Sequence, residues 1–548
     1  MVAVVATWLL AAVIAVGLGL PISCRLTPNG PSALRGALWL GLFIGAVGLA
    51  AVNLITPLRS PAVAYGIAGV ALVGLATSWP RMRKAQWTRT EESRWWFWGI
   101  GIVAVAGALG WSIAATYAPT NYDTGLYHLN AIEYAAQAAT VPGLANLFGP
   151  LGFSTVMMPL AAAFTNGPLG ESGYVAVNGF LLLLLPADVL LRLFGPGGPT
   201  VGARIVFVGT LAIYPPLLWT ANVAVTSPTT ETAALVLTLI GVAALADAVW
   251  RKFCTPTSVL VVVASLSLAA AIHPQAWVMV VGAFLVMARV QRRDYNNRGG
   301  SRTVLRASLA LPAIALLVVA ARDIRLSGWL FYPLDTFPIR VSWIAEEAQF
   351  DAGRAFTSPA RGRSLPERAD SQGSWLAEAL AHLAGSWEFW ILAIMFSLGS
   401  VLLIRRKSIA RLNDLAVTIA PGIAAIVLWL VASPTPLRFD WGPWISTAAV
   451  LVGWGWMYYR SLEPFVQGIG AVVVIVALAA AISIEAPKWP VDIPRPEAGK
   501  FSSADGLKLR LPMKGDRCWG VFPSCSRNPS PGTLLRGTSW QDGYSRIR

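Results

Sequence analysis

The sequence predicts an all-α integral membrane protein with about fourteen transmembrane helices, and three observations support this fold class. Hydrophobic residues occupy 55% of the 548 positions, whereas charged residues occupy only 13%. A soluble domain carries about 25% charged residues, so this chain cannot cover its surface with charge. Apolar stretches of about 17–25 residues, long enough to cross a bilayer, recur along the chain. This composition excludes a soluble enzyme, a disordered protein and a coiled coil.

The apolar stretches give the expected order of helices. We expect the first apolar stretch to be a helix of the mature protein. A secretory signal would carry a basic residue before its apolar run, and none is present here. We expect the spans to begin near residues 2, 36, 61, 95, 172, 204, 231, 257, 275, 307, 387, 414, 443 and 464.

Basic residues predict which side of the membrane each loop faces. They gather in the short segments 80–94, 289–306 and 405–411. With fourteen spans these segments all fall on one side, which the positive-inside rule identifies as the cytoplasm. Both termini then lie outside. The net charge of +15 is therefore explained first by topology, and we expect no nucleic-acid partner.

Three segments fall on the expected outer face: 117–171, which has no Lys or Arg, the polar loop 322–386 and the tail after residue 484. Cys24 and Cys254 fall on the reducing side, whereas Cys518 and Cys525 fall in the tail, where a disulfide can persist. Gly and Pro between them allow a tight loop. We predict a Cys518–Cys525 disulfide and an ordered cap, the alternative being two free thiols in a floppy tail.

The segment after the fourth span is the first candidate for chemistry. Asp123 or Thr124 can cap a helix there. The helix is expected to be amphipathic and to lie on the membrane surface. Its apolar face holds Leu126, Leu129, Ile132 and Ala136, and its polar face holds Asn130, Glu133 and Gln137. An apolar turn at 141–147 is expected to re-enter toward the lipid, and 152–165 is too short to span. The alternative role for Asp123 is that of a helix cap alone.

Further polar residues gather at the outer ends of other spans. Each alone has a structural explanation, such as a snorkelling Arg, an ion pair or a helix cap. Their shared side suggests an outward cavity suited to an anionic lipid substrate and an acid/base group. They are Glu231, His273, Arg322, Asp323, Arg325, Arg438 and Asp440.

Motifs of soluble enzymes offer no competing assignment. The sequence has no P-loop, no dinucleotide-binding glycine pattern and no zinc-type Cys pairs. Three histidines in the whole chain argue against a His-based metal centre. We therefore assign no metal ligand and no certain cofactor, while a divalent cation bound by carboxylates stays open.

A series of motifs follows along the chain: Tyr122-Asp123-Thr124-Gly125-Leu126-Tyr127-His128, Val141-Pro142-Gly143-Leu144-Ala145-Asn146-Leu147, Leu326-Ser327-Gly328-Trp329-Leu330-Phe331-Tyr332-Pro333, Thr435-Pro436-Leu437-Arg438-Phe439, and in the tail Gly515-Asp516-Arg517-Cys518-Trp519, Pro523-Ser524-Cys525, Arg536-Gly537 and Asp542-Gly543-Tyr544. In these motifs, from about residue 95 to its end, the chain resembles a family of bacterial multi-spanning membrane proteins of unassigned activity found among polysaccharide and O-antigen biosynthesis genes. Two positions depart from the usual family residues, with Glu231 for Asp and Asp323 for Asn.

The layout is also similar to that of GT-C glycosyltransferases, in which an acidic residue follows a span and an interfacial helix lies beside it. This resemblance implies a sugar donor on a polyprenyl phosphate, a glycan acceptor, and Asp123 as the base. Arg438, Arg325 and His128 are candidates for phosphate binding only because of their charge and their expected position on the outer side of the membrane. Because the acid of GT-C enzymes usually follows the first span, residues 1–94 would be a three-helix appendage, 95–483 the membrane core and 484–548 an extracytoplasmic tail.

The leading hypothesis is thus a membrane glycosyltransferase working on the outer face of the cytoplasmic membrane. The alternatives are a polysaccharide polymerase or ligase, which usually relies on outer-loop Arg and His, and a lipid-linked glycan transporter or flippase. A transporter would be expected to show internal repeats and charges near the membrane midplane. The expected catalytic residues are Asp123 and Glu133, and the expected substrate-binding residues are Tyr122, Tyr127, His128, Asn146, Glu231, His273, Arg322, Arg325, Tyr332, Arg438 and Asp440.

Overall fold

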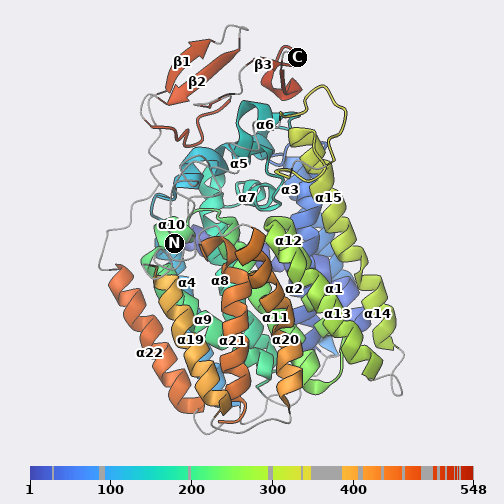
Figure 1. Ribbon diagram of the computed structural model, residues 1–548, viewed down its shortest axis with the longest axis vertical. Helices are drawn as coiled ribbons and strands as arrows, with labels where there is room; N and C mark the ends of the chain where they lie inside the picture. Colours follow the sequence, from blue (N-terminus) through green and yellow to red (C-terminus); the bar gives the residue numbers. More distant parts are fainter. Residues whose placement is uncertain are drawn as a thin grey trace.

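The computed structural model is a helical bundle with a small β-containing tail at one end (Figure 1). It describes residues 1–27, 30–84, 93–194, 199–293, 300–334, 337–346, 386–404, 411–432, 437–459, 463–482, 498–502, 507–512, 515–523, 525–526, 529 and 532–546. Most of the expected polar loop 322–386 and the start of the tail therefore lie outside the described residues.

Each of the predicted spans corresponds to a helix. These helices are α1 (Val2–Leu26), α2 (Gly30–Val52), α3 (Pro61–Arg83), α4 (Ser93–Ala114), α8 (Val177–Leu193), α9 (Val201–Trp219), α11 (Thr230–Arg251), α12 (Pro256–Ile272), α13 (Trp277–Arg293), α15 (Ala310–Ser327), α19 (Trp387–Ile404), α20 (Leu412–Ala432), α21 (Trp441–Trp456) and α22 (Glu463–Ile482). Within the described residues, 11 helices are long and apolar enough to cross a membrane. The protein is therefore a multi-pass membrane protein, while the total of fourteen crossings stays a prediction.

Short helices and turns fill one end of the bundle. They are the π-helix η1 (Thr124–His128), α5 (Leu129–Gln137), α6 (Leu144–Leu147), η2 (Gly149–Gly152), α7 (Met157–Phe164), η3 (Gly170–Ala176), α10 (Ala221–Ala224), η4 (Pro274–Ala276) and η7 (Leu437–Asp440). In Figure 1, α5, α6 and α7 lie toward the top, directly beneath the tail. We call this end the capped end. The helix α14 (Gly300–Ser308), which contains the last part of the basic segment 289–306, lies at the opposite end (Figure 1).

Two of the basic segments meet at that opposite end, as the predicted topology requires. Arg293 at the end of α13 lies 3.9 Å from the Asp414 carboxylate in the first turn of α20. The Arg411 guanidinium, just before α20, lies 4.0 Å from the ring centre of Trp250 in α11. The chain therefore arranges its basic turns together, away from the tail.

Buried charges tie the first helices to the rest of the bundle. Arg35 of α2 lies 2.7 Å from Asp188 of α8, and Arg192 lies 2.6 Å from the other oxygen of the same carboxylate. Arg192 also pairs with Asp247 of α11. Because each of these charges is compensated, the cost of taking it out of water is reduced. In the structure α1–α3 pack into the bundle through α2, and a domain boundary at residue 94 stays a prediction.

The tail is an ordered unit with two small antiparallel sheets. Strand β1 (Ala498–Ser502) pairs with β2 (Lys508–Pro512), and β3 (Thr533–Leu535) pairs with β4 (Tyr544–Arg546). The predicted Cys518–Cys525 disulfide is confirmed. Leu507, Leu509 and Tyr544 share a buried apolar cluster with Tyr134 of α5 and Leu144 of α6. The tail therefore covers α5 and α6 as a cap.

This covering changes two expectations for the segment beneath it. The turn at 141–147 does not re-enter toward lipid, because Gly143 donates its N–H to the Arg325 carbonyl at 2.9 Å and Pro142 accepts from Tyr544 at 2.9 Å. Asn130, expected on a solvated helix face, is only 2% exposed. The regular spacing of polar residues on α5 predicts a face whose side chains need hydrogen-bond partners. For Asn130 these partners are in the tail and not in water.

Thiol labelling gives a first prediction, which concerns the redox state of the tail. Denatured but unreduced protein is expected to expose two reactive thiols, Cys24 and Cys254, which are free and buried in the fold. Reduction is expected to raise the number to four, the total in the chain. Mass spectrometry after alkylation measures this count. Four alkylated cysteines without reduction would contradict both the disulfide and the oxidising location of the tail.

Candidate functional site at the capped end

Asp123 is held by the turn that joins α4 to the π-helix η1. Thr120 donates its N–H to the Asn222 carbonyl at 2.8 Å, and the Asn121 amide donates to the Val223 carbonyl at 3.2 Å. The side-chain oxygen of Asn121 accepts the N–H of Asp123 at 2.8 Å. These bonds fix Asp123 beside α10, which directly precedes the turn into α11.

The Asp123 side chain makes no hydrogen bond that caps η1. Its role as a helix cap alone, the structural alternative, therefore has no support in this geometry. A π-helical turn is rare and is frequently found at functional sites. The side chain is 14% exposed, so the carboxylate is partly shielded yet still reachable.

Arg438 faces Asp123 from a distant part of the chain. It lies in η7, just before α21, and one of its terminal guanidinium nitrogens lies 4.0 Å from a carboxylate oxygen of Asp123. The side chain of Arg438 is 45% exposed. The alternative ionic partner was Asp440, whose pKa is raised by burial to about 8. The charge of Arg438, in contrast, lowers the pKa of the Asp123 carboxyl, which favours Asp123 as the anion that Arg438 meets.

Two further carboxylates act on the same guanidinium. Glu231 occupies the first turn of α11, and its charge interacts with those of both Arg438 and Asp123. Glu388 occupies the first turn of α19 and also interacts with Arg438. We call Asp123, Glu231, Glu388 and Arg438 the Asp123 cluster. Glu388 was not among the residues predicted from the sequence, although an acid in the first turn of a span at the same end is the signal that marked Glu231.

The turn that carries Glu231 is fixed by a buried amide. Asn178 of α8 is fully buried, and its side-chain nitrogen donates to the Ser227 carbonyl at 2.8 Å and to the Thr229 hydroxyl at 3.0 Å. Because this turn also precedes α11 directly, Asn178 sets where the helix begins. The position of Glu231 thus follows from packing inside the bundle.

Tyrosines and a histidine adjoin the cluster. Burial raises the pKa of Tyr127 well above its ordinary value, and the charges of Asp123 and Glu231 raise it further, which places the three groups near one another. Tyr122 is 45% exposed, and its hydroxyl donates to the Asp516 carboxylate. His128 is 2% exposed, and burial lowers its pKa to about 3. A neutral His128 is not a charged ligand for phosphate.

Other predicted site residues hold the capped end together. Glu133 lies 3.5 Å from Arg59 and accepts from Gln137 at 2.7 Å. The Asn146 amide donates to the Trp343 carbonyl at 2.9 Å, and the Tyr332 hydroxyl donates to the Gly149 carbonyl at 3.0 Å. None of these hydrogen bonds and ion pairs in the described part of the chain joins the Asp123 cluster.

The contacts described for the remaining predicted residues do not involve the Asp123 cluster either. Arg322 donates to the side-chain oxygen of Asn53 and to the Thr140 hydroxyl, each at 3.0 Å, so it links α15 to α2. The charge of Arg536 in the tail acts on Arg325. His273 follows α12, and burial lowers its pKa to about 4, so it is neutral. Their assignment to substrate binding stays a prediction.

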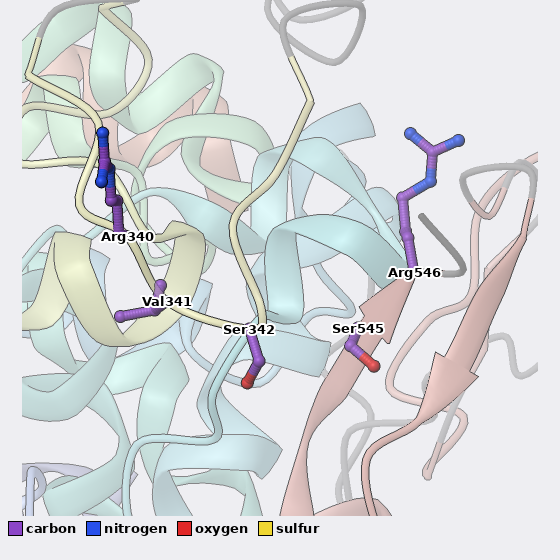
Figure 2. A pocket seen from close by; sticks show the side chains of 5 residues that line it. All are labelled: Arg340, Val341, Ser342, Ser545 and Arg546. Atoms are coloured by element: carbon purple, nitrogen blue, oxygen red, sulfur yellow. The ribbon is translucent and has the colours of Figure 1, made fainter.

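An open cavity of about 880 Å³ lies elsewhere at the capped end (Figure 2). Segment 340–342 and β4 line it from two sides, through Arg340, Val341, Ser342, Ser545 and Arg546. None of these residues belongs to the Asp123 cluster, and Arg546 pairs with Glu346. Among the described residues, no group of three or more His, Cys, Asp or Glu side chains is arranged to hold a metal ion.

The fold and this site define a multi-pass membrane protein with a charged cluster at one membrane boundary. The chain belongs to the family described as "Domain of unknown function (DUF8201)", which matches residues 1–442. That match includes the first three helices and ends before the tail.

No curated protein matches the chain. Among solved structures, it is similar to the arabinosyltransferase EmbB from Mycobacterium smegmatis, with a TM-score of 0.38 and 14% sequence identity. The likeness covers 77% of this chain and 41% of that chain, so the present chain spans about two fifths of the EmbB chain. A likeness of this degree does not by itself assign a reaction.

Proposed function

We propose that the protein is a membrane glycosyltransferase on the outer face of the cytoplasmic membrane. It transfers a sugar from a polyprenyl-phosphate donor to a cell-envelope glycan or a lipid-linked acceptor. The observation that carries this proposal is the pairing of a partly shielded Asp123 carboxylate with an exposed Arg438 guanidinium at 4.0 Å. A base and a phosphate-binding cation are the two groups that such a transfer needs side by side.

In the proposed reaction, Asp123 accepts the proton of an acceptor hydroxyl as the hydroxyl oxygen bonds to the anomeric carbon of the donor sugar. The bond between that carbon and the phosphate oxygen breaks, and the polyprenyl phosphate leaves with the electron pair. Arg438 stabilises the negative charge that develops on the leaving phosphate. The carboxylates of Glu231 and Glu388 interact electrostatically with Arg438, so they are suited to orient Arg438 or to bind sugar hydroxyls.

The alternatives receive less support from the described residues. A polymerase or ligase usually relies on outer-loop Arg and His; of the histidines, burial keeps His128 and His273 neutral, and His382 lies outside the described residues. A transporter would be expected to place charges near the midplane, whereas Asp188, Asp247 and their arginine partners neutralise one another. Both observations favour the transferase.

The proposal is tested with purified protein and a panel of polyprenyl-phosphate sugars, using lipid-linked and free glycans as acceptors. Release of polyprenyl phosphate that depends on an acceptor is the expected result. Movement of intact donor across proteoliposomes without release of the phosphate would instead identify a flippase. Growth of the glycan by whole repeat units, with a pyrophosphate-linked donor, would identify a polymerase.

The pH dependence of the reaction follows from the environment of Asp123. Burial raises the pKa of this carboxyl above its ordinary value of 3.8, and Arg438 opposes the rise. A base works only when ionised, so kcat/KM is expected to fall as the pH drops through the raised pKa, with a slope of about one proton. Initial rates between pH 3.8 and 8 at saturating acceptor measure this limb. A kcat/KM that stays constant as the pH drops to 3.8 would contradict Asp123 as the base, because a carboxyl with a raised pKa is less than half ionised at that pH.

A further inference from the structure

The disulfide loop of the tail packs directly on the turn that carries Asp123. Trp519 donates its backbone N–H to the Gly125 carbonyl at 2.7 Å, and its side chain is only 6% exposed. A Cβ atom on Gly125 would lie 2.5 Å from the Trp519 indole. The missing side chain of Gly125 therefore lets the indole cover η1 two residues beyond Asp123.

Asn130 holds the same loop from the next helix. Its amide nitrogen donates to the Val521 carbonyl at 2.9 Å, and its oxygen accepts the Gly520 N–H at 3.3 Å. Both Trp519 and Gly520 have positive φ angles, 45° and 73°. Positive φ is strained for a bulky residue such as Trp519, so the contacts on both sides maintain a conformation that the loop would not adopt alone.

The tail also contacts the residue that precedes Asp123. The Tyr122 hydroxyl donates to Asp516, and the Arg517 guanidinium lies 5.7 Å from the Tyr122 ring centre and 5.4 Å from that of Trp519. The segment Asp516–Trp519 thus touches the chain on both sides of Asp123, at Tyr122 and at Gly125.

We propose that Trp519 is a positioning residue for Asp123. By covering Gly125, the indole keeps η1 in its π-helical form, and this form sets the direction in which the Asp123 carboxylate points toward Arg438. The Cys518–Cys525 disulfide and the Asn130 amide hold the indole in place. This inference rests on the proposed function for its kinetic consequences, but the contact between the tail and η1 does not.

Substitutions on both sides of the contact test the inference. Trp519→Ala is expected to lower kcat by about 10²-fold, the cost of misplacing a catalytic group by about 1 Å, while donor KM changes less than about threefold. Trp519→Phe is expected to restore most of the rate. Gly125→Ala should lower kcat similarly, because its new Cβ meets the indole. Combining Gly125→Ala with Trp519→Ala should cost no more than either alone, since both disturb one contact.

Trp540→Ala is the matched control. Trp540 lies in the same tail and packs on Tyr134 and Phe522, with ring centres 5.7 and 4.7 Å away, so its loss weakens the cap without removing the Gly125 contact. It is expected to lower the unfolding temperature but to leave kcat and its pH profile unchanged. An equal fall of kcat in Trp540→Ala and Trp519→Ala would reduce Trp519 to a general stabiliser of the tail.

Hydrogen exchange provides a readout that needs no turnover. Trp519→Ala is expected to raise the exchange rates of the amides of residues 124–129 at least tenfold, whereas Trp540→Ala leaves them unchanged. Unchanged exchange in Trp519→Ala would overturn the positioning role. If exchange rises while the wild-type protein releases no polyprenyl phosphate from any donor, the positioning contact stands and the proposed glycosyl transfer fails.

Discussion

Asp123→Asn is expected to lower kcat by about 10²–10⁴-fold, the range in which loss of a general base falls. Asparagine keeps the shape of the side chain but cannot take a proton from the acceptor hydroxyl. Since the Asp123 side chain makes no hydrogen bond that caps η1, the substitution removes no capping bond from the fold. Release of polyprenyl phosphate from the active donor measures the loss, and size-exclusion profiles and unfolding temperature should remain those of the wild-type protein.

Glu171→Gln is a matched control for this variant. Glu171 is another carboxylate at the capped end, with a side chain that is 72% exposed and an ion pair to Arg59 at 3.2 Å. Exposed pairs contribute about 0–1 kcal/mol, so neither folding nor turnover should change measurably. Near-normal turnover in Asp123→Asn would remove Asp123 from the mechanism and return it to a structural role.

The positions of the helices could be predicted because apolar length is a local property. The Cys518–Cys525 disulfide could be predicted from topology, since the other cysteines fall at the far ends of α1 and α11. The shortest of these helices, α12 with 17 residues and α21 with 16, reach only about 25 Å at 1.5 Å per residue, less than the roughly 30 Å of a bilayer's hydrocarbon core.

The site itself could be predicted only in part, because its geometry depends on contacts between distant segments. Asp123 and Arg438 stood out individually, but the sequence does not contain the packing of η7 against α11 that lets them meet. His128 was expected as a cation because composition does not report burial, and in the fold it is enclosed beside Thr124. Glu388 was overlooked because it directly precedes an apolar run and resembles an ordinary helix-start acid.

The role of the tail was also hidden from the sequence. An ordered cap over the outer face, helping to cover the substrate cavity, was expected, but the motif around Cys518 gave no indication of which residues it contacts. The polar face of α5 was interpreted as solvated, since the periodicity of Asn130 is the same for water and for a protein partner. Only the fold shows Asn130 bonded to the backbone of the disulfide loop, with Trp519 against Gly125. The tail is thereby connected to the Asp123 turn rather than to the membrane surface.

Arg438→Lys is expected to raise the donor KM by about 10–100-fold, the equivalent of losing one charge-assisted hydrogen bond of about 1.5–3 kcal/mol. A guanidinium can bind two phosphate oxygens at once, and a lysine ammonium cannot reproduce that geometry even though it keeps the charge. The side chain of Arg438 is 45% exposed beside Asp123, so an incoming phosphate can approach its guanidinium. Initial rates over a range of donor concentrations, with acceptor saturating, measure the change.

Arg438→Ala separates phosphate binding from the effect of Arg438 on the base. Arg438 lowers the pKa of Asp123, so removing its charge should raise that pKa and move the acid limb of kcat/KM to higher pH. Arg438→Lys keeps a positive charge near Asp123 and should move the limb much less, while still weakening the donor. The exposed Arg340, outside the Asp123 cluster, supplies the control Arg340→Ala, with neither effect expected. If Arg438→Lys left the donor KM unchanged, the guanidinium would serve only as an ionic partner within the fold, and phosphate recognition would have to come from another cation at the capped end.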